Sequence, residues 1–261
     1  MLPLASVRIV EAWVPLHRPW VHPGAMKAAD RLRHMVNGYQ VAQALHVAAT
    51  LRISDLLAAG PRSVADLATA AGADPDALGR LLHALSTVGV YARTEDASYC
   101  NTELGAALRS DVPNSVAGWA RLVGQPYYWQ AWAHLLHGVR TGENSFAALH
   151  GTSIWRYRAE HPEEQEIFDH AMTSLSAAVG RAVVDAYDFG RFTTVVDVGG
   201  GRGALLAAVL ARHPHLLGVL FDQPGVVDAP DDLLERAGVA GRCTRVGGDF
   251  FTANHVAPLL A

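Results

Sequence analysis

The sequence has few cysteines and no long apolar run, the features that are typical of secreted and membrane proteins. Its only two cysteines, Cys100 and Cys243, lack the spacing of a metal site, so we expect two buried, unpaired thiols in a reducing cytoplasm. No apolar run approaches the roughly 20 residues that cross a bilayer. The first 25 residues are interrupted by four prolines and lack the apolar centre of a signal peptide. We therefore expect a cytoplasmic protein with no membrane partner, and interpret residues 1–26 as a weakly ordered extension.

Positive charge is not in excess either. The 21 Lys and Arg residues are outnumbered by 25 Asp and Glu, which gives a net charge of -4. A surface that collects phosphate backbones normally has a basic excess, so the composition argues against a nucleic-acid partner. What the chain does have is apolar content: half of its 261 residues are apolar and 18% are charged. This is enough for one large domain or two smaller ones with a sizeable core.

The first part of the chain, residues 27–110, has the pattern of a winged helix. Apolar residues recur at helical spacing from Asn37 to about Leu57, which predicts a long helix. Ser63 is placed to cap a second helix, and Asp74 followed by proline opens a third. Two short strands, 90–93 and 98–101, then flank a polar hairpin tip.

A winged helix often binds DNA, but its charges here do not suit that function. The presumed recognition helix, 75–88, has Arg80 and His83 as its only possible cations, and Asp74 and Asp76 stand at its start, where phosphates would have to lie. We therefore favour packing or dimerisation as the function of this domain.

Residues 111–190 form a predicted helical connector that is rich in aromatic side chains. Two interpretations stay open for these rings. The core interpretation is favoured for any single ring, and the alternative is that the rings together wall a pocket for a flat organic substrate. The acidic stretch "EHPEEQE" is interpreted as a charged helix start. The candidate pocket residues are Trp119, Tyr128, Trp129 and Trp132.

The stretch "TTVVDVGGGRGALLAAVLARHP" reads as strand, glycine turn and helix. That order opens a doubly wound α/β sheet, and the glycines let a ligand approach the backbone. A second strand, 217–221, leads into Asp222, about 20 residues beyond the glycines, where a carboxylate accepts from ribose hydroxyls. A third strand, in "RCTRVGGDFF", ends in Asp249 and Phe250, an acid and an aromatic ring that suit an adenine. Residues 191–261 are therefore predicted to be an incomplete Rossmann-like domain.

The spacing of the glycines distinguishes a site for a nicotinamide dinucleotide from a site for S-adenosylmethionine. A nicotinamide site prefers G-x-G-x-x-G, but the third required position holds Ala204. The glycines run Gly199, Gly201 and Gly203, preceded by Asp197, and this tighter form favours S-adenosylmethionine over a dinucleotide.

In this order and spacing, "VVDVGGGRG", "FDQPGVV" and "GGDFF" resemble the S-adenosylmethionine-dependent O-methyltransferases of small aromatic molecules. Plant phenylpropanoid enzymes and bacterial antibiotic-tailoring enzymes of secondary metabolism share this family. The resemblance runs from about residue 27 to 251 and implies an N-terminal winged-helix dimerisation domain, a helical connector, the first three strands of a Rossmann-like sheet, and a homodimer.

The resemblance also implies roles for individual residues. Gly199 and Gly201 would lie against the cofactor, Asp222 would hold the ribose, and Asp249 with Phe250 would hold the adenine. Met172 and Ser176 match family positions that line the cofactor pocket, although the residues alone predict that Met172 is core.

One family feature has no counterpart in this sequence. The resemblance implies that a histidine after a fourth strand is the general base, and this chain ends before such a segment, so no catalytic residue is assigned. His255 lies in the tail "TANHVAPLLA", without a strand and helix to aim it. With three strands only, Val195, Val196 and Val198 are expected at an exposed sheet edge.

Two functions are left open. The first is an enzyme that methylates a hydroxyl of an aromatic or polyketide-like small molecule. The alternative is a catalytically inactive, truncated homologue that dimerises and binds the cofactor.

Overall fold

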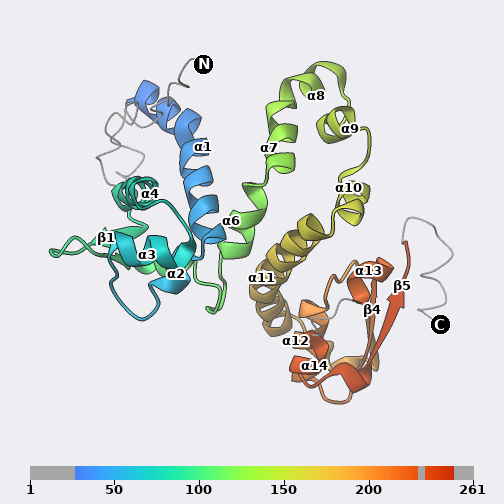
Figure 1. Ribbon diagram of the computed structural model, residues 1–261. Coiled ribbons are helices and arrows are strands. Elements are labelled where there is room, and N and C mark those ends of the chain that lie inside the picture. Colours follow the sequence, from blue (N-terminus) through green and yellow to red (C-terminus); the bar gives the residue numbers. More distant parts are fainter. Residues whose placement is uncertain (1–26, 229–232, 250–261) are drawn as a thin grey trace. The chain divides into compact units, whose positions relative to one another are not determined.

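The computed structural model describes residues 27–228 and 233–249 (Figure 1). The chain forms two compact units that divide between Arg109 and Ser110. Within the described ranges, no helix has both the length and the apolar character needed to cross a membrane.

The N-terminal unit is mainly helical, with one small hairpin. The predicted first helix begins at Ala28 rather than Asn37, and it does not continue to Leu57, because Arg52 adopts a left-handed conformation (φ 55°) that separates it from a second helix. The elements in chain order are α1 (Ala28–Thr50), α2 (Ile53–Leu56), α3 (Val64–Ala71), α4 (Pro75–Thr87), β1 (Tyr91–Arg93), β2 (Tyr99–Asn101) and α5 (Glu103–Ala106).

Local signals at the ends of these elements are confirmed. Ser63 Oγ accepts from the Asp66 amide at 3.1 Å, and Asp74 Oδ1 accepts from the Ala77 amide at 2.8 Å. The hairpin β1–β2 is antiparallel, and Tyr99 also bridges Arg62. The hydroxyl of Tyr91 lies 3.0 Å from the Ser54 hydroxyl, and burial raises the pKa of Tyr91 to about 12.

The C-terminal unit starts with a run of helices. Its longest helix, α11, contacts both α6 and α12, and it packs closely on α6, since a Cβ at Gly118 would lie 3.0 Å from Ala171 Cα (Figure 1). The run consists of α6 (Ala117–Val123), α7 (Pro126–Ala133), α8 (Leu135–Thr141), α9 (Ser145–His150), α10 (Ile154–Glu160), α11 (Pro162–Ala186) and the short helix η3 (Phe189–Arg191).

A parallel sheet follows, in the order β3–β4–β5. The first two of its three strands lie where the sequence predicts them, and the third ends at Gly247, before the predicted end at Asp249 and Phe250. The strands are β3 (Thr194–Val198), β4 (Leu217–Asp222) and β5 (Cys243–Gly247). Val198 pairs with Phe221 and Asp222 with Gly247, so the carboxyl ends of the strands lie side by side. Over the described ranges β3 pairs with β4 only, and Val198 is 45% exposed, as expected for an edge strand.

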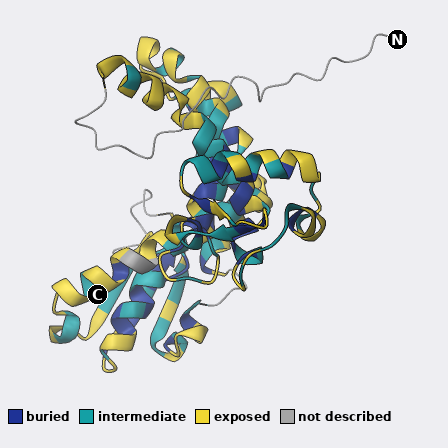
Figure 2. Cartoon of the chain, turned by 90° about the vertical axis from the view of Figure 1, so that its left-hand side faces the viewer, coloured by how far each residue is buried: buried dark blue, intermediate teal, exposed yellow. Residues whose placement is uncertain are grey.

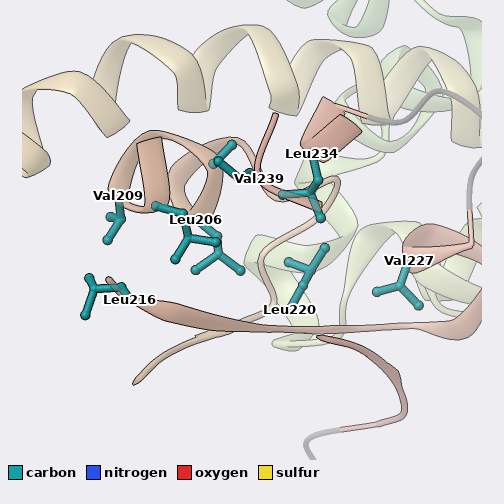
Figure 3. Packing of buried hydrophobic residues seen from close by; sticks show 9 residues of the cluster. Leu206, Val209, Leu216, Leu220, Val227, Leu234 and Val239 are labelled. Carbon is teal, nitrogen blue, oxygen red and sulfur yellow. The ribbon is translucent and has the colours of Figure 1, made fainter. Parts of the chain in front are cut away.

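The core of this unit lies between α12 (Ala204–Arg212) and the sheet. Figure 3 shows Leu206 and Val209 of α12 above Leu216 and Leu220. Gly218 lets the helix come close, because a Cβ there would lie 2.8 Å from Leu210 Cδ1. The remaining elements are α13 (Pro224–Val227), α14 (Leu233–Arg236) and the short helix η4 (Ala240–Arg242).

Burial differs from the prediction at the two cysteines. Figure 2 shows the buried positions in dark blue along helices and strands, but Cys100 on β2 and Cys243 on β5 are only half-buried. Neither forms a disulfide bond. Cys100 is the middle residue of β2, and Cys243 is the first residue of β5.

Candidate functional site

The glycine turn joins the end of β3 to the start of α12. Gly199, Gly201 and Gly203 have φ angles of 71°, 58° and 81°, a region that other residues enter only with strain. The Gly199 amide donates to the Phe221 carbonyl at 2.8 Å, which ties the turn to the end of β4.

Asp222, the last residue of β4, holds the middle of this turn. Its Oδ2 accepts from the Gly201 amide at 2.8 Å, and its Oδ1 accepts from the Gln223 amide at 2.7 Å. The structure therefore brings together two residues that the sequence places 21 positions apart. A carboxylate has about four acceptor positions, so Asp222 can still accept from other hydroxyls.

Asp197 lies inside β3, under the turn. Its carboxylate accepts from the Leu206 amide in the first turn of α12, while its Oδ2 is buried with no hydrogen-bond partner in the described structure. Burial raises the pKa of Asp197, the charge of Asp222 raises it further, and the bond from Leu206 opposes both. Gly200 is required beside it, since a Cβ there would lie 2.6 Å from Asp197 Cγ.

The third predicted contact region begins after β5. The Gly248 amide donates to the Asp222 backbone carbonyl at 2.9 Å, so the exposed Asp249 directly follows a residue bound to the end of β4. Phe250 and His255 lie outside the described residues.

Met172 and Ser176 lie on α11, which contacts α12. A Cβ at Gly180 would lie 3.6 Å from Leu205 Cα, and Asp169 bonds to Arg202 of the glycine turn. Positions 169, 172, 176 and 180 share one face of a helix, so both residues lie between two contacts with the turn and the start of α12. Met172 is half-buried and not core, contrary to the prediction from residues alone, and Ser176 is exposed.

One charged group was not anticipated from the sequence. Arg202, inside the glycine turn, has a side chain only 5% exposed, and it bonds to Glu166 at 2.6 Å and to Asp169 at 3.3 Å. The stretch containing Glu166 was interpreted as a charged helix start. Glu163 and Glu164 do lie in the first turn of α11, but Glu166 binds the turn. The sequence signal that could have predicted this contact was an arginine among glycines, together with two acids, Glu166 and Asp169, three positions apart on a predicted helix.

The aromatic side chains of α6 and α7 separate into two groups. Tyr127 is core: it is 3% exposed, stacks on Tyr157 and accepts from Arg158 Nε at 3.1 Å. Tyr128 and Trp129 are half-buried, whereas Trp119 is 37% and Trp132 60% exposed. The core interpretation is therefore wrong for these two tryptophans, because nothing in the C-terminal unit as described covers them fully.

No group of three or more His, Cys, Asp and Glu side chains in the described ranges could hold a metal ion. The polar groups of the site are thus the backbone amides of the turn and three carboxylates, Asp197, Asp222 and Asp249.

Comparison with known proteins gives matches over both units. A model of the O-methyltransferase dimerisation domain matches residues 33–111, and a model of the O-methyltransferase domain matches residues 132–257. A phenazine O-methyltransferase of Lysobacter antibioticus is 44% identical over 228 residues, which cover 87% of this chain and 67% of the relative.

Solved structures of methyltransferases also match this chain. The crystal structure of LaPhzM matches with a TM-score of 0.82 and 44% identity, over 87% of this chain and 68% of that one. NcsB1 from neocarzinostatin biosynthesis, in complex with S-adenosylmethionine and 2-hydroxy-5-methyl naphthoic acid, matches with a TM-score of 0.65 and 36% identity, over 81% of this chain and 65% of that one. The chain spans 67%, 64% and 62% of the lengths of the first three curated relatives that it matches.

Proposed function

Because this chain belongs to the O-methyltransferase family, we propose that it binds S-adenosylmethionine and that the protein transfers the methyl group to a hydroxyl of an aromatic or polyketide-like small molecule. The observation that carries the proposal is the hydrogen bond from the Gly201 amide to Asp222, which joins the glycine turn to the acid that ends the next strand. Family membership comes from both domain models and the 44% identical relative.

The residues present suit this cofactor. A Cβ at Gly201 would meet nothing within 4 Å, so open space lies beside the turn for an adenosyl group. Asp222 has acceptor positions left for ribose hydroxyls, and we assign the adenine to Asp249 and Phe250. Asp197 Oδ2 has no donor in the described structure, and an ammonium or hydroxyl donor of the cofactor would supply one. When bound, the cofactor supplies an electrophilic methyl group on a sulfonium.

We propose that Met172 and Ser176 complete the cofactor site from α11. The acceptor would pack on the aromatic side chains of α6 and α7, namely Trp119, Tyr128, Trp129 and Trp132. The exposure of Trp119 and Trp132 supports this assignment, since exposed rings are available to stack on a flat molecule. The aromatic acid bound in the NcsB1 complex supports an acceptor of this class. No residue is assigned as the general base.

We also propose that the protein is a cytoplasmic homodimer without a nucleic-acid partner. Leu32, Met35, Val36 and Tyr39 form an exposed apolar stripe at helical spacing on α1, within or beside the range that the dimerisation model matches. Acids at the start of α4 and the net charge of -4 argue against binding to phosphate backbones. The two cysteines form no disulfide bond, which suits a reducing compartment.

Calorimetric titration with S-adenosylmethionine and S-adenosylhomocysteine tests the cofactor proposal. We expect the wild-type chain to bind both, and Asp222→Ala to bind at least about tenfold more weakly, because a charge-assisted hydrogen-bond partner is lost. Asp228→Ala is the control: this exposed carboxylate follows α13 in the next turn, and its removal should leave the affinity unchanged.

Two outcomes would contradict the proposal: a wild-type chain that binds neither compound, or an Asp222→Ala variant that binds as the wild type does. A methyl-transfer assay on a panel of phenols then distinguishes the two functions. Binding without transfer would favour the inactive, dimerising homologue.

A further inference from the structure

Arg202 stands in the middle of the glycine turn, between Gly201 and Gly203, which both have positive φ angles. An exposed position would suit such a long, charged side chain, yet only 5% of it is exposed. Because the two flanking residues are glycines, the direction in which Arg202 leaves the turn is coupled to the conformation of the turn itself.

The side chain crosses to a single turn of α11. Its Nη2 donates to Glu166 Oε2 at 2.6 Å and to Asp169 Oδ2 at 3.3 Å. Both acceptors are themselves held: Gln165 donates to Asp169 Oδ1 at 2.7 Å, and His170 lies 2.9 Å from Glu166 Oε1. Burial is the largest single influence and raises the pKa of Glu166, but the hydrogen bonds and positive charges of Arg202 and His170 together outweigh it and lower that pKa.

A buried ion pair is by itself weak evidence of a stabilising role. A buried ion pair is often no more stabilising than apolar side chains of the same volume, because the charges must leave water. What an arginine between two carboxylates does provide is direction, since the guanidinium is planar and its donors have a fixed geometry.

We propose that Arg202 is a positioning residue for the cofactor. It fixes the position of the glycine turn relative to α11, and so the position of Gly201 relative to Met172. This inference rests on the proposed function. Met172 follows Asp169 by three residues, on the same side of the helix, and Gly201 directly precedes Arg202. Arg202 thereby links the strand side of the cofactor site to its helix side, without touching the cofactor.

The test compares Arg202→Met and Arg202→Lys with Val209→Ala. Val209 lies on α12, seven residues after Arg202, and is 1% exposed in the core between this helix and the sheet. Its truncation therefore destabilises the unit without changing a residue of the glycine turn. We expect Arg202→Met to bind S-adenosylhomocysteine about tenfold more weakly than the wild type, because part of the binding free energy must then order the turn against α11. Arg202→Lys should lie between them, and Val209→Ala should keep wild-type affinity even at an equal loss of melting temperature.

A double-mutant cycle with Glu166→Gln tests whether Arg202 affects cofactor affinity through its bond to α11. If Arg202 acts through α11, the losses of affinity in Arg202→Met and Glu166→Gln will not add in the double variant. Equal affinity of Arg202→Met and the wild type, or the same loss in Val209→Ala, would overturn the proposal.

Amide hydrogen exchange at residues 199–203 separates this inference from the proposed function. We expect faster exchange in Arg202→Met than in Val209→Ala, whether or not a ligand is added. If the wild-type chain did not bind S-adenosylhomocysteine, the proposed function would fail, and the exchange data would still decide whether Arg202 fixes the turn. Unchanged exchange in Arg202→Met would refute the positioning role.

Discussion

The glycine turn contains two neighbouring glycines that are needed for different reasons. Gly201 has open space around it but a φ of 58°, so another residue would meet backbone strain of about 1 kcal/mol. Gly200 has no such φ, but a Cβ there would lie 2.6 Å from both Asp197 Cγ and Leu220 Cδ1. The sequence motif therefore combines one requirement for conformation with one for space, and the second confines the Asp197 carboxylate.

That confinement predicts a pH dependence. Burial raises the folded-state pKa of Asp197 above its ordinary value of 3.8, so this group's contribution to stability is present below that value and lost as the pH rises through the raised pKa. We expect Asp197→Asn, whose amide oxygen can still accept from Leu206, to remove this loss. In thermal unfolding without ligand at pH 7, the variant should melt a few degrees higher than the wild type, and the two should converge near pH 4.

A lower melting temperature for Asp197→Asn at pH 7 would contradict this reasoning, because it would mean that the ionised carboxylate stabilises the fold. Asp228→Asn, an exposed carboxylate, is the matched control and should leave the pH dependence unchanged.

At the scale of helices and strands, the sequence predicted what depends on neighbours along the chain. Ser63 and Asp74 cap their helices, and β3 lies where β-branched residues gather. It did not predict contacts between distant segments: Arg202 and Asp169 are 33 residues apart, and no local pattern couples them. For the same reason the sequence left two interpretations of Trp132 open, since burial depends on which element packs on a helix face.

The connector contains a second buried arginine, which gives a prediction for the packing of α7 against α10. Arg158 is 3% exposed, lies 3.9 Å from the centroid of Phe168 and donates to the Tyr127 hydroxyl. Tyr127→Phe leaves that buried donor without its acceptor, so we expect the free energy of unfolding in urea to fall by about 1–2 kcal/mol. Tyr128→Phe, one residue along and half-buried, should cost less than half of this.

The double variant Tyr127→Phe/Arg158→Met checks the cause. If the loss comes from the hydrogen bond, the two single losses will not add, because each already removes it. Strict additivity would show that the two side chains stabilise the connector independently.

At the scale of the whole molecule, the exposed apolar stripe on α1 leads us to expect a dimer. Met35 and Val36 are 75% and 70% exposed, in a helix whose turns also expose Leu32 and Tyr39. An exposed apolar row of this kind is typical of a surface that a second copy covers. We expect the wild-type chain to sediment as a dimer and Met35→Glu/Val36→Glu as a monomer, because two carboxylates would have to be buried unpaired at the interface.

Arg212→Glu is the control for charge, since it changes the net charge by the same amount, -2, at an exposed position of the other unit. It should sediment as the wild type does. Sedimentation velocity at several protein concentrations separates a weakened dimer from a monomer, because only the former shows a concentration-dependent coefficient. If the Met35→Glu/Val36→Glu variant kept the dimer mass at every concentration, the α1 stripe would not be the interface, and the exposed side chains of α1 would need another partner.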